Sequence, residues 1–239
     1  MGTDDVDMGS PMRWEVLKRL QAAEDPHSSP NLLTILTLDR DVLVRAAIAG
    51  NPSTPPGVLT ALTADASTGV HMRLAGNEFT PPEVLRQLSR SNDARVRYAA
   101  ASNHRTPPGA LMRLAMDADA TVRADAARIL CFPPELLAEL ADDDDAGVRI
   151  ALASNPSTPP EVLTRLAGDV LWVVRSVVAH RADTSSDVLA RLARDKDWHV
   201  REAVAGNKRT PPDVLARLAG DEEPLVRGAA ANNPRTPPR

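Results

Sequence analysis

Short groups of apolar residues alternate with polar turns along the chain, and the alternation repeats every 26 residues. Within one repeat, Val58 and Leu62 are spaced for one face of a helix, and so are Val44 and Ile48. Helices of two or three turns are not stable alone in water. The pattern therefore predicts pairs of short helices that stack into a continuous array, in which each unit packs mainly on its neighbours.

Fixed polar residues mark where these helices begin and end. Proline fits the first turn of a helix, so the first helix is expected over residues 54 to about 64, with Thr54 as its N-cap. The second helix is expected over residues 42–50, and Asn51 is expected to end it in the left-handed conformation. The Pro-Pro pair recurs at residues 55–56, 81–82, 107–108, 133–134, 159–160, 211–212 and 237–238, and Ser185-Ser186 occupies the missing slot.

The repeat also predicts the domain organisation. Residues 1 to about 10 are acidic and are expected to be a disordered tail. Residues 11–239 are expected to form a single repeat domain, with a degenerate capping repeat at about 11–30 and then about eight repeats, the last incomplete. The pattern stops at residues 233–239, where another helix is due. Three explanations stay open: an exposed last face, a homodimer through this uncapped repeat, or a fragment of a longer protein.

A charged pair recurs between the helices. Asp39 precedes Arg45 by six residues. Two interpretations are possible: a stripe of anion-binding arginines, or a ladder of Asp-Arg hydrogen bonds that joins one repeat to the next. The ladder is preferred, because each arginine has an aspartate partner. The exceptions, Asp65/His71 and Ser91/Arg97, are expected to be the loosest joints. The complete pairs are Asp39/Arg45, Asp117/Arg123, Asp143/Arg149, Asp169/Arg175, Asp195/Arg201 and Asp221/Arg227.

The first helices carry an arginine column of their own. It contains Arg113, Arg165, Arg191 and Arg217. Three of these follow an acidic residue by four positions, in the pairs Glu161/Arg165, Asp187/Arg191 and Asp213/Arg217. Such i,i+4 pairs are favourable on a helix surface. A solvated face is therefore preferred here over a basic binding stripe.

The consensus V-R-x-A-x-A-x-N-P-x-T-P-P-x-V-L-x-x-L-A-x-D resembles the leucine-rich repeat variant family over about residues 24–239. The resemblance implies an all-α, right-handed solenoid of two-helix repeats, with alternating α and short α or 3-10 helices and no β-sheet. The Asp-x5-Arg spacing is also similar to HEAT repeats, within the armadillo-like class of α-solenoids. Some members of the variant family carry an N-terminal iron–sulfur module. This chain has no cysteine before Cys131, so the cluster is not carried over.

Composition narrows the function. The 28 basic and 32 acidic side chains give a net charge of -4, which argues against a basic footprint for nucleic acid. One cysteine excludes an internal disulfide and a multi-cysteine metal site. No apolar stretch approaches the roughly 20 residues of a membrane helix, so no membrane partner is expected and the cytoplasm is the expected compartment.

Residues that could act in catalysis or bind a metal are not clustered by the repeat. The five histidines occupy different columns, and no metal-ligand spacing or phosphate loop is present. Cys131 lies in an unusual apolar turn at residues 129–132, where a packing role is preferred over a nucleophile. Residues 142–145 are acidic, and a solvated turn is preferred over a cation site. The sequence thus predicts no catalytic residue, no metal and no cofactor.

Some positions of the second helix vary from repeat to repeat, and each set of equivalent positions is called a column here. The columns that contain Tyr98, Trp172 and His180 are the candidate binding surface. By analogy with HEAT arrays, this face is expected to line the concave side, and most of its residues are small or apolar, unlike an idle solvated face. Trp172 and Trp198 share one column in adjacent repeats, and two interpretations carry equal weight: a paired binding anchor or a cover over a weak joint. The candidate contacts are Tyr98, Arg128, Ile150, Trp172, His180, Trp198 and Glu202.

Three functions remain open at this point. The favoured hypothesis is a non-enzymatic scaffold that binds a protein or peptide. The alternative is a nucleic-acid-binding array, which requires a basic concave face and strong salt dependence. A HEAT-like repeat enzyme is the least favoured, because no acid–base groups cluster.

Overall fold

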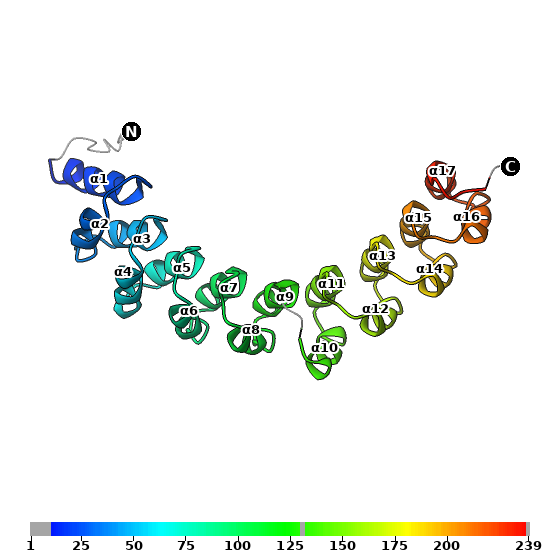
Figure 1. The fold of residues 1–239 in the computed structure, drawn as a ribbon, viewed down its shortest axis with the longest axis horizontal. Coiled ribbons are helices and arrows are strands. Elements are labelled where there is room, and N and C mark those ends of the chain that lie inside the picture. The colour runs from blue at the N-terminus through cyan, green and yellow to red at the C-terminus, as the bar shows by residue number, and fades with distance from the viewer. Residues whose placement is uncertain (1–10, 130–131, 238–239) are drawn as a thin grey trace, which may run out of the picture. The chain divides into compact units, whose positions relative to one another are not determined.

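The computed structural model describes residues 11–129 and 132–237, and every regular element within them is a helix (Figure 1). The chain divides into two compact units, residues 1–116 and 117–239. The predicted acidic tail and Cys131 lie outside the described residues. The single-domain assignment of residues 11–239 stays a prediction.

Each unit is built from the same alternation of helices. Unit 1 contains α1 (Pro11–Glu24), α2 (Pro30–Leu36), α3 (Val42–Gly50), α4 (Pro56–Ala61) with the 3-10 turn η1 (Leu62–Ala64), α5 (Thr68–Gly76), α6 (Pro82–Leu88), α7 (Ala94–Ser102) and α8 (Pro108–Leu114). Unit 2 contains α9 (Ala120–Ile129), α10 (Pro134–Ala141), α11 (Ala146–Ser154), α12 (Pro160–Leu166), α13 (Trp172–His180), α14 (Ser186–Leu192), α15 (Trp198–Gly206), α16 (Pro212–Leu218) and α17 (Pro224–Asn232).

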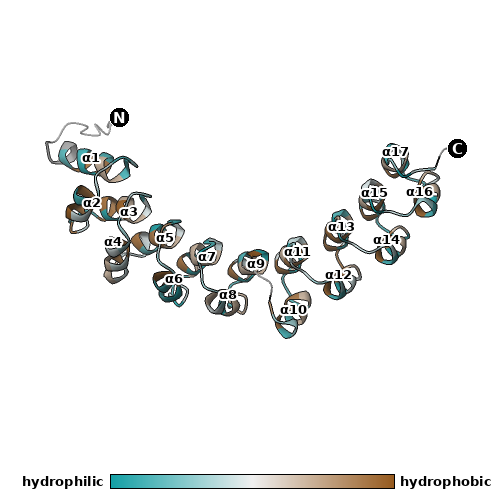
Figure 2. Cartoon of the chain, viewed as in Figure 1, coloured by the Kyte–Doolittle hydropathy of each residue, from teal (hydrophilic) through white to brown (hydrophobic). Residues whose placement is uncertain are grey.

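The helices form two rows within each unit. Odd-numbered helices pack on one another, as α3 does on α5 and α13 on α15, and the even-numbered helices form the second row. Figure 1 shows the odd-numbered row on the inner side of the bend in each unit. Figure 2 shows apolar and polar residues mixed within each helix, as expected for helices that bury one face. The predicted solenoid of two-helix repeats is confirmed.

The odd-numbered helices match their expected bounds, whereas the even-numbered helices begin later than expected. Val44, Ile48 and Ala49 of α3 are completely buried, and alanine recurs at the position of Ala49 in every repeat of the chain. Helix α4 begins at Pro56, and its N-cap is Pro55 rather than Thr54. The Thr54 hydroxyl instead donates a hydrogen bond to the carbonyl of Ile48 at 2.7 Å. The predicted threonine cap is therefore wrong, because the buried hydroxyl bonds a carbonyl in the last turn of the preceding helix, which also accepts from the N–H of Asn51 at 3.1 Å.

Serine replaces proline at one of these starts. Ser185 is the N-cap of α14, and its hydroxyl accepts a hydrogen bond from the N–H of Val188 at 3.3 Å. A side-chain cap of this kind compensates for the missing Pro-Pro pair. The Ser185-Ser186 slot thus keeps its helix start by a different local contact.

The asparagine that recurs after the odd-numbered helices does not adopt the left-handed conformation. Asn51 has an extended backbone with φ of -75°, and no described residue has a positive φ. Its side-chain N–H groups cross to the preceding repeat, where they donate to the carbonyls of Ala23 at 2.7 Å and Asp25 at 2.9 Å. Asn51 does end α3 as its C-cap, but the expected left-handed conformation is wrong. Only the stacked neighbour supplies the two carbonyls that hold this amide. Asn77, Asn103, Asn207 and Asn233 make the same pair of bonds.

The arginine ladder joins consecutive repeats through two kinds of contact. Arg149 donates through Nη1 to the backbone carbonyl of Asp143 at 2.6 Å, within its own repeat. Its Nε donates to Oδ2 of Asp169, twenty residues further on, at 2.6 Å. The predicted ladder is confirmed, but the carboxylate partner belongs to the next repeat. The rungs join Arg19 to Asp39, Arg45 to Asp65, Arg123 to Asp143, Arg149 to Asp169, Arg175 to Asp195, and Arg201 to Asp221.

The two exceptional repeats share one incomplete rung. His71 stands in the arginine column and Ser91, twenty residues on, stands in the aspartate column. The buried Nε2 of His71 has no hydrogen-bond partner among the described residues. Asp65, by contrast, pairs normally with Arg45 at 2.6 Å. The expected two loose joints are therefore a single joint between the repeats of α5 and α7.

Arginines of the even-numbered helices also reach across repeats. The expected i,i+4 pairs are wrong, because no ion pair within the described residues joins Glu161 to Arg165. Arg165 forms its ion pair with Asp142 of the preceding repeat. Arg191 likewise donates to the carbonyl of Thr164 at 2.8 Å. Exposed i,i+4 pairs contribute only about 0.2–0.5 kcal/mol, so an acceptor on the neighbouring helix competes easily.

Candidate functional site

Trp172 and Trp198 are joined through a histidine that lies between them. The ring of His199 stacks on Trp172 with centroids 4.2 Å apart and an interplanar angle of 20°. On its other side it stacks on Trp198, at 3.6 Å and 23°. The stack links the N-terminal ends of α13 and α15. It therefore spans the joint between two repeats.

Asp197 holds the histidine in this position. Its Oδ1 accepts a hydrogen bond from the N–H of His199 at 3.0 Å, as the N-cap of α15. The same oxygen lies 2.9 Å from Nδ1 of the His199 ring. One carboxylate thus orients both the start of the helix and the imidazole. The stack is a preorganised surface rather than three independent side chains.

An exposed apolar segment continues from this stack. Residues 170–173, Val-Leu-Trp-Val, form the turn before α13 and its first two residues. All four remain exposed, Val170 at 81%, Leu171 at 42%, Trp172 at 38% and Val173 at 36%. We name residues 170–173, Trp198 and His199 the aromatic patch. Contiguous apolar surface of this kind is typical of interaction sites.

The aromatic patch replaces a structural element present in other repeats. Asp41, Asp93, Asp145 and Asp197 are N-caps of their helices, and each carboxylate accepts from a backbone N–H at the helix start. Leu171 is the N-cap of α13 and makes no side-chain hydrogen bond. An aspartate cap contributes about 0.5–2 kcal/mol over an apolar residue. The chain thus gives up a local stabilising contact where the patch is exposed.

The remaining predicted contacts are distributed over other helices. Tyr98 lies on α7 in unit 1, and its side chain is exposed. Arg128 and His180 are exposed at the ends of α9 and α13, whereas Ile150 on α11 and Glu202 on α15 are partly buried. Nδ1 of His180 lies 3.0 Å from the carbonyl of Ser176 in the same helix. Among these seven residues of the described chain, ring stacking brings together only the two tryptophans, and all seven stay predictions as partner contacts.

Two hollows accompany the odd-numbered helices. In unit 1, a hollow of about 700 Å³ lies between α1, α3 and α5, with small or apolar residues such as Ala46, Gly50 and Met72 in its lining. These belong to the columns predicted to face the concave side. In unit 2, a hollow of about 830 Å³ lies beside α16 and α17 and includes Arg227 and Gly228. It adjoins the helix face where the homodimer was expected, and that assembly stays a prediction.

The acidic turn at residues 142–145 has structural partners. Asp142 pairs with Arg165 and Asp143 with Arg123. Asp145 caps α11 by accepting from the N–H of Gly147 at 2.7 Å. No group of three or more metal-ligating side chains occurs in residues 11–129 and 132–237. In the same residues, no helix is long and apolar enough to cross a membrane.

Comparison with known proteins shows what the repeats are similar to. The leucine rich repeat variant family model matches residues 146–170 and 198–223. A solved structure described as "a leucine-rich repeat variant with a novel repetitive protein structural motif" is similar over nearly the whole chain. It is 27% identical, covers 97% of this chain and 99% of its own, and has a TM-score of 0.69. Two stretches of the chain thus match the family model, and the whole chain is similar in fold to this solved leucine-rich repeat variant.

Other similarities are weaker. An engineered protein is 17% identical and covers 94% of this chain and 75% of its own, with a TM-score of 0.32. A designed armadillo repeat protein in complex with the peptide (KR)4 is 17% identical over 93% of each chain, with a TM-score of 0.23. Such low scores carry no argument about this chain. No curated protein matches it.

Departures from the 26-residue repeat identify surface residues that the sequence did not predict. Val170, Leu171, Val173 and His199 were not among the predicted contacts. The sequence does hold a signal for Leu171, because it is the one apolar residue in a column otherwise made of Asp, Ser and Glu. The histidine had no such signal, since its stacking partner Trp172 lies on a different helix.

Proposed function

We propose that this leucine-rich repeat variant array is a non-enzymatic scaffold that binds a protein or peptide partner through the aromatic patch. The observation that carries the proposal is the replacement of an aspartate cap by the exposed Leu171 beside Trp172. The replacement weakens a helix start and exposes apolar surface to water. Both changes are unfavourable for the free chain, and a partner that covers the patch offsets them.

The chemistry of the patch indicates the kind of partner. Leu171 and Trp172 offer an apolar surface, and the indole and imidazole rings supply large rigid contact area with few rotatable bonds. The partner segment is therefore apolar, such as one face of an amphipathic helix. The half-exposed Glu202, one turn along α15 from Trp198, would contribute to the polar rim. The proposal assigns no catalytic residue and no cofactor.

Leu171→Asp is the sharpest variant for testing this function. It removes apolar surface from the centre of the patch and restores the cap present in other repeats. Quantitative affinity purification from the source cells is expected to lose specific partners with this variant, although the variant is at least as stable as the wild type. Trp172→Ala with Trp198→Ala is expected to lose the same partners.

The matched control is Leu225→Gln, which alters another exposed leucine at the start of α17. Partners that depend on the patch are retained by this control. If Leu171→Asp and the wild type purify the same proteins in the same amounts, the patch is not the binding surface. Recovery of nucleic acid in place of protein, with steep salt dependence, would favour the alternative function.

A further inference from the structure

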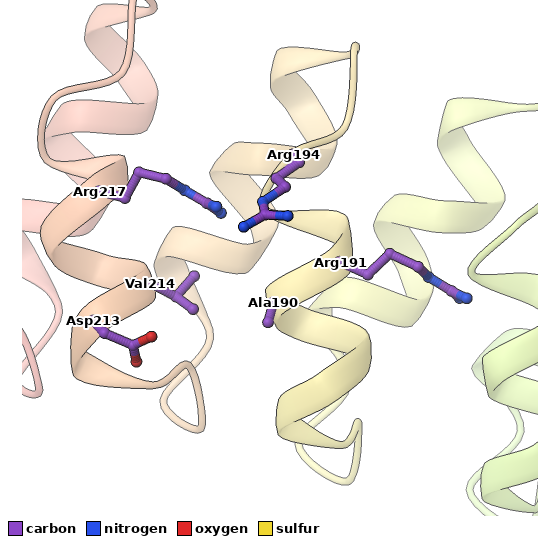
Figure 3. Close-up of a pocket in the computed structure, with 6 residues that line it drawn as sticks. All are labelled: Ala190, Arg191, Arg194, Asp213, Val214 and Arg217. Carbon is purple, nitrogen blue, oxygen red and sulfur yellow. The ribbon is translucent and has the colours of Figure 1, made fainter.

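A pocket on the even-numbered helices of unit 2 brings together arginines that form no ion pair with any carboxylate of the described residues. The pocket lies between α14 and α16, has a volume of about 750 Å³, and is lined by Ala190, Arg191, Arg194, Asp213, Val214 and Arg217. Figure 3 shows the guanidinium groups of Arg194 and Arg217 turned toward each other across it. Arg191 points the other way, where it donates to the carbonyl of Thr164 at 2.8 Å.

The repeat itself shows what normally stands opposite such an arginine. Arg165 pairs with Asp142, which precedes it by 23 residues. The residue in the same relation to Arg217 is Arg194. An acid–base pair in one repeat is thus a pair of facing cations two repeats later. Like charges held close together are unfavourable unless an anion is bound between them.

The acidic residue in the lining does not neutralise this pair. Figure 3 shows the carboxylate of Asp213 directed away from both guanidinium groups. No ion pair within the described residues joins Asp213 to Arg194 or Arg217. The buried Val214 and the partly buried Ala190 also line the pocket. An anion in contact with these apolar side chains is partly shielded from water, which strengthens its interaction with charge.

We propose that Arg194 and Arg217 bind one phosphate monoester group in this pocket. A guanidinium presents its N–H donors as a planar fork that matches phosphate oxygens. A phosphate monoester carries a charge of about -1.5 to -2 at neutral pH. This charge balances the two guanidinium groups more completely than the single negative charge of a carboxylate ligand would. The ligand is a small phosphomonoester or a phosphorylated side chain, since both present the same group.

A single phosphate fits this surface better than a nucleic-acid backbone. A polyanion requires a track of unpaired cations along its path. In the array, Arg165 is neutralised by Asp142, and Arg191 is engaged by a backbone carbonyl. The pocket is therefore an isolated anion site. It lies on different helices from the aromatic patch and does not depend on the proposed function.

Calorimetric titration of the full chain with phenyl phosphate at low ionic strength tests the site. The wild type is expected to bind one equivalent saturably. Arg194→Asp recreates the pairing seen between Arg165 and Asp142, so this variant keeps the fold while weakening binding by about tenfold or more. Arg165→Gln is the control and is expected to change the affinity by less than about twofold. Absence of saturable binding, or equal affinity in Arg194→Asp, overturns the proposal.

Two further ligands distinguish the sources of the phosphate. A short phosphoserine peptide that binds more tightly than phenyl phosphate indicates a phosphorylated partner, whereas equal affinity indicates a small phosphomonoester. Either result supports the site. Oligothymidylate binding that strengthens with length and persists in Arg194→Asp would overturn it in favour of a polyanion.

Discussion

Nε of Arg175 donates a hydrogen bond to Oδ2 of Asp195 at 2.6 Å, and only 7% and 8% of the two side chains are exposed. Nη1 of the same arginine donates to the backbone carbonyl of Asp169 at 2.7 Å. One guanidinium therefore fixes the loop of its own repeat and the carboxylate of the next. The repeats are joined by buried polar contacts in addition to their apolar core.

Removing one side of this rung is expected to be costly. Asp195→Ala leaves the buried guanidinium of Arg175 without its counterion, and the expected loss is about 3–5 kcal/mol in the free energy of unfolding. Urea denaturation followed by circular dichroism measures it. The control is Asp142→Ala, which breaks the exposed pair with Arg165 and is expected to cost less than about 1 kcal/mol. Equal losses would show that burial of the rung contributes nothing.

The ladder also predicts destabilisation in acid. Hydrogen bonds from Arg123 and Arg201 hold the pKa values of Asp143 and Asp221 below their usual value. Burial alone would raise the pKa of Asp195, but the bonds from Arg175 and the N–H of Asp197 outweigh it and the pKa is lowered. A lowered folded pKa stabilises the fold above the unfolded pKa of about 3.9, and this stability is lost as the pH falls through the folded pKa.

Thermal unfolding at a series of pH values between 7 and 2 measures this linkage. The melting temperature is expected to change little down to about pH 5 and to fall steeply below about pH 4. Asp195→Asn removes one of the titrating groups, so its melting temperature is expected to depend less on pH. An equally steep fall in this variant would contradict the assignment of the acid sensitivity to the rungs.

The incomplete rung at His71 and Ser91 can be rebuilt. His71→Arg alone buries an arginine without its carboxylate, and Ser91→Asp alone buries a carboxylate without its arginine. Together they are expected to form the missing contact, with a favourable coupling of about 0.5–3 kcal/mol in a double-mutant cycle of unfolding free energies. Strictly additive effects of the two changes would show that these positions do not meet.

Loss of a bridging asparagine is expected to loosen the adjacent joint. Asn207 donates to the carbonyls of Ala179 at 2.7 Å and Arg181 at 2.8 Å. Asn207→Ala leaves both without this donor, and the expected cost is about 1–3 kcal/mol in unfolding free energy. Arg181→Asn is the matched comparison, because Nη1 of Arg181 already bonds the equivalent carbonyls of Ala153 and Asn155. That change is expected to cost less than about 1 kcal/mol. A larger loss would mean that the two donors are not equivalent.

Restoring the cap of α13 is expected to stabilise the free chain. Leu171→Asp supplies a carboxylate for the backbone N–H groups at the helix start, as Asp145 and Asp197 do for α11 and α15. The expected gain is about 0.5–2 kcal/mol, measured by urea denaturation in the absence of any partner. A destabilised variant would mean that the packing of Leu171 stabilises the fold by more than an aspartate cap does.

The 26-residue period, the helix pairs and the invariant buried columns were determined by the sequence alone. These features depend on residues a few positions apart, as with the spacing of Val44 and Ile48. The fold class and the bounds of α3 could therefore be predicted, whereas the even-numbered helices begin later than the sequence indicated. The two tryptophans could also be singled out, because they depart from a regular column.

Only the tertiary structure decided which residues meet across the joints. Arg175 pairs with the carboxylate of Asp195 in the next repeat and not with that of Asp169 in its own. Asn51 donates to carbonyls of the preceding repeat, and His199 stacks on Trp172. These partners depend on the offset between stacked repeats, which short-range spacing does not specify. The incomplete rung and the facing arginines could be recognised only once that offset was known. A substitution within the repeat can be interpreted only when the residue that it contacts in the neighbouring repeat is known.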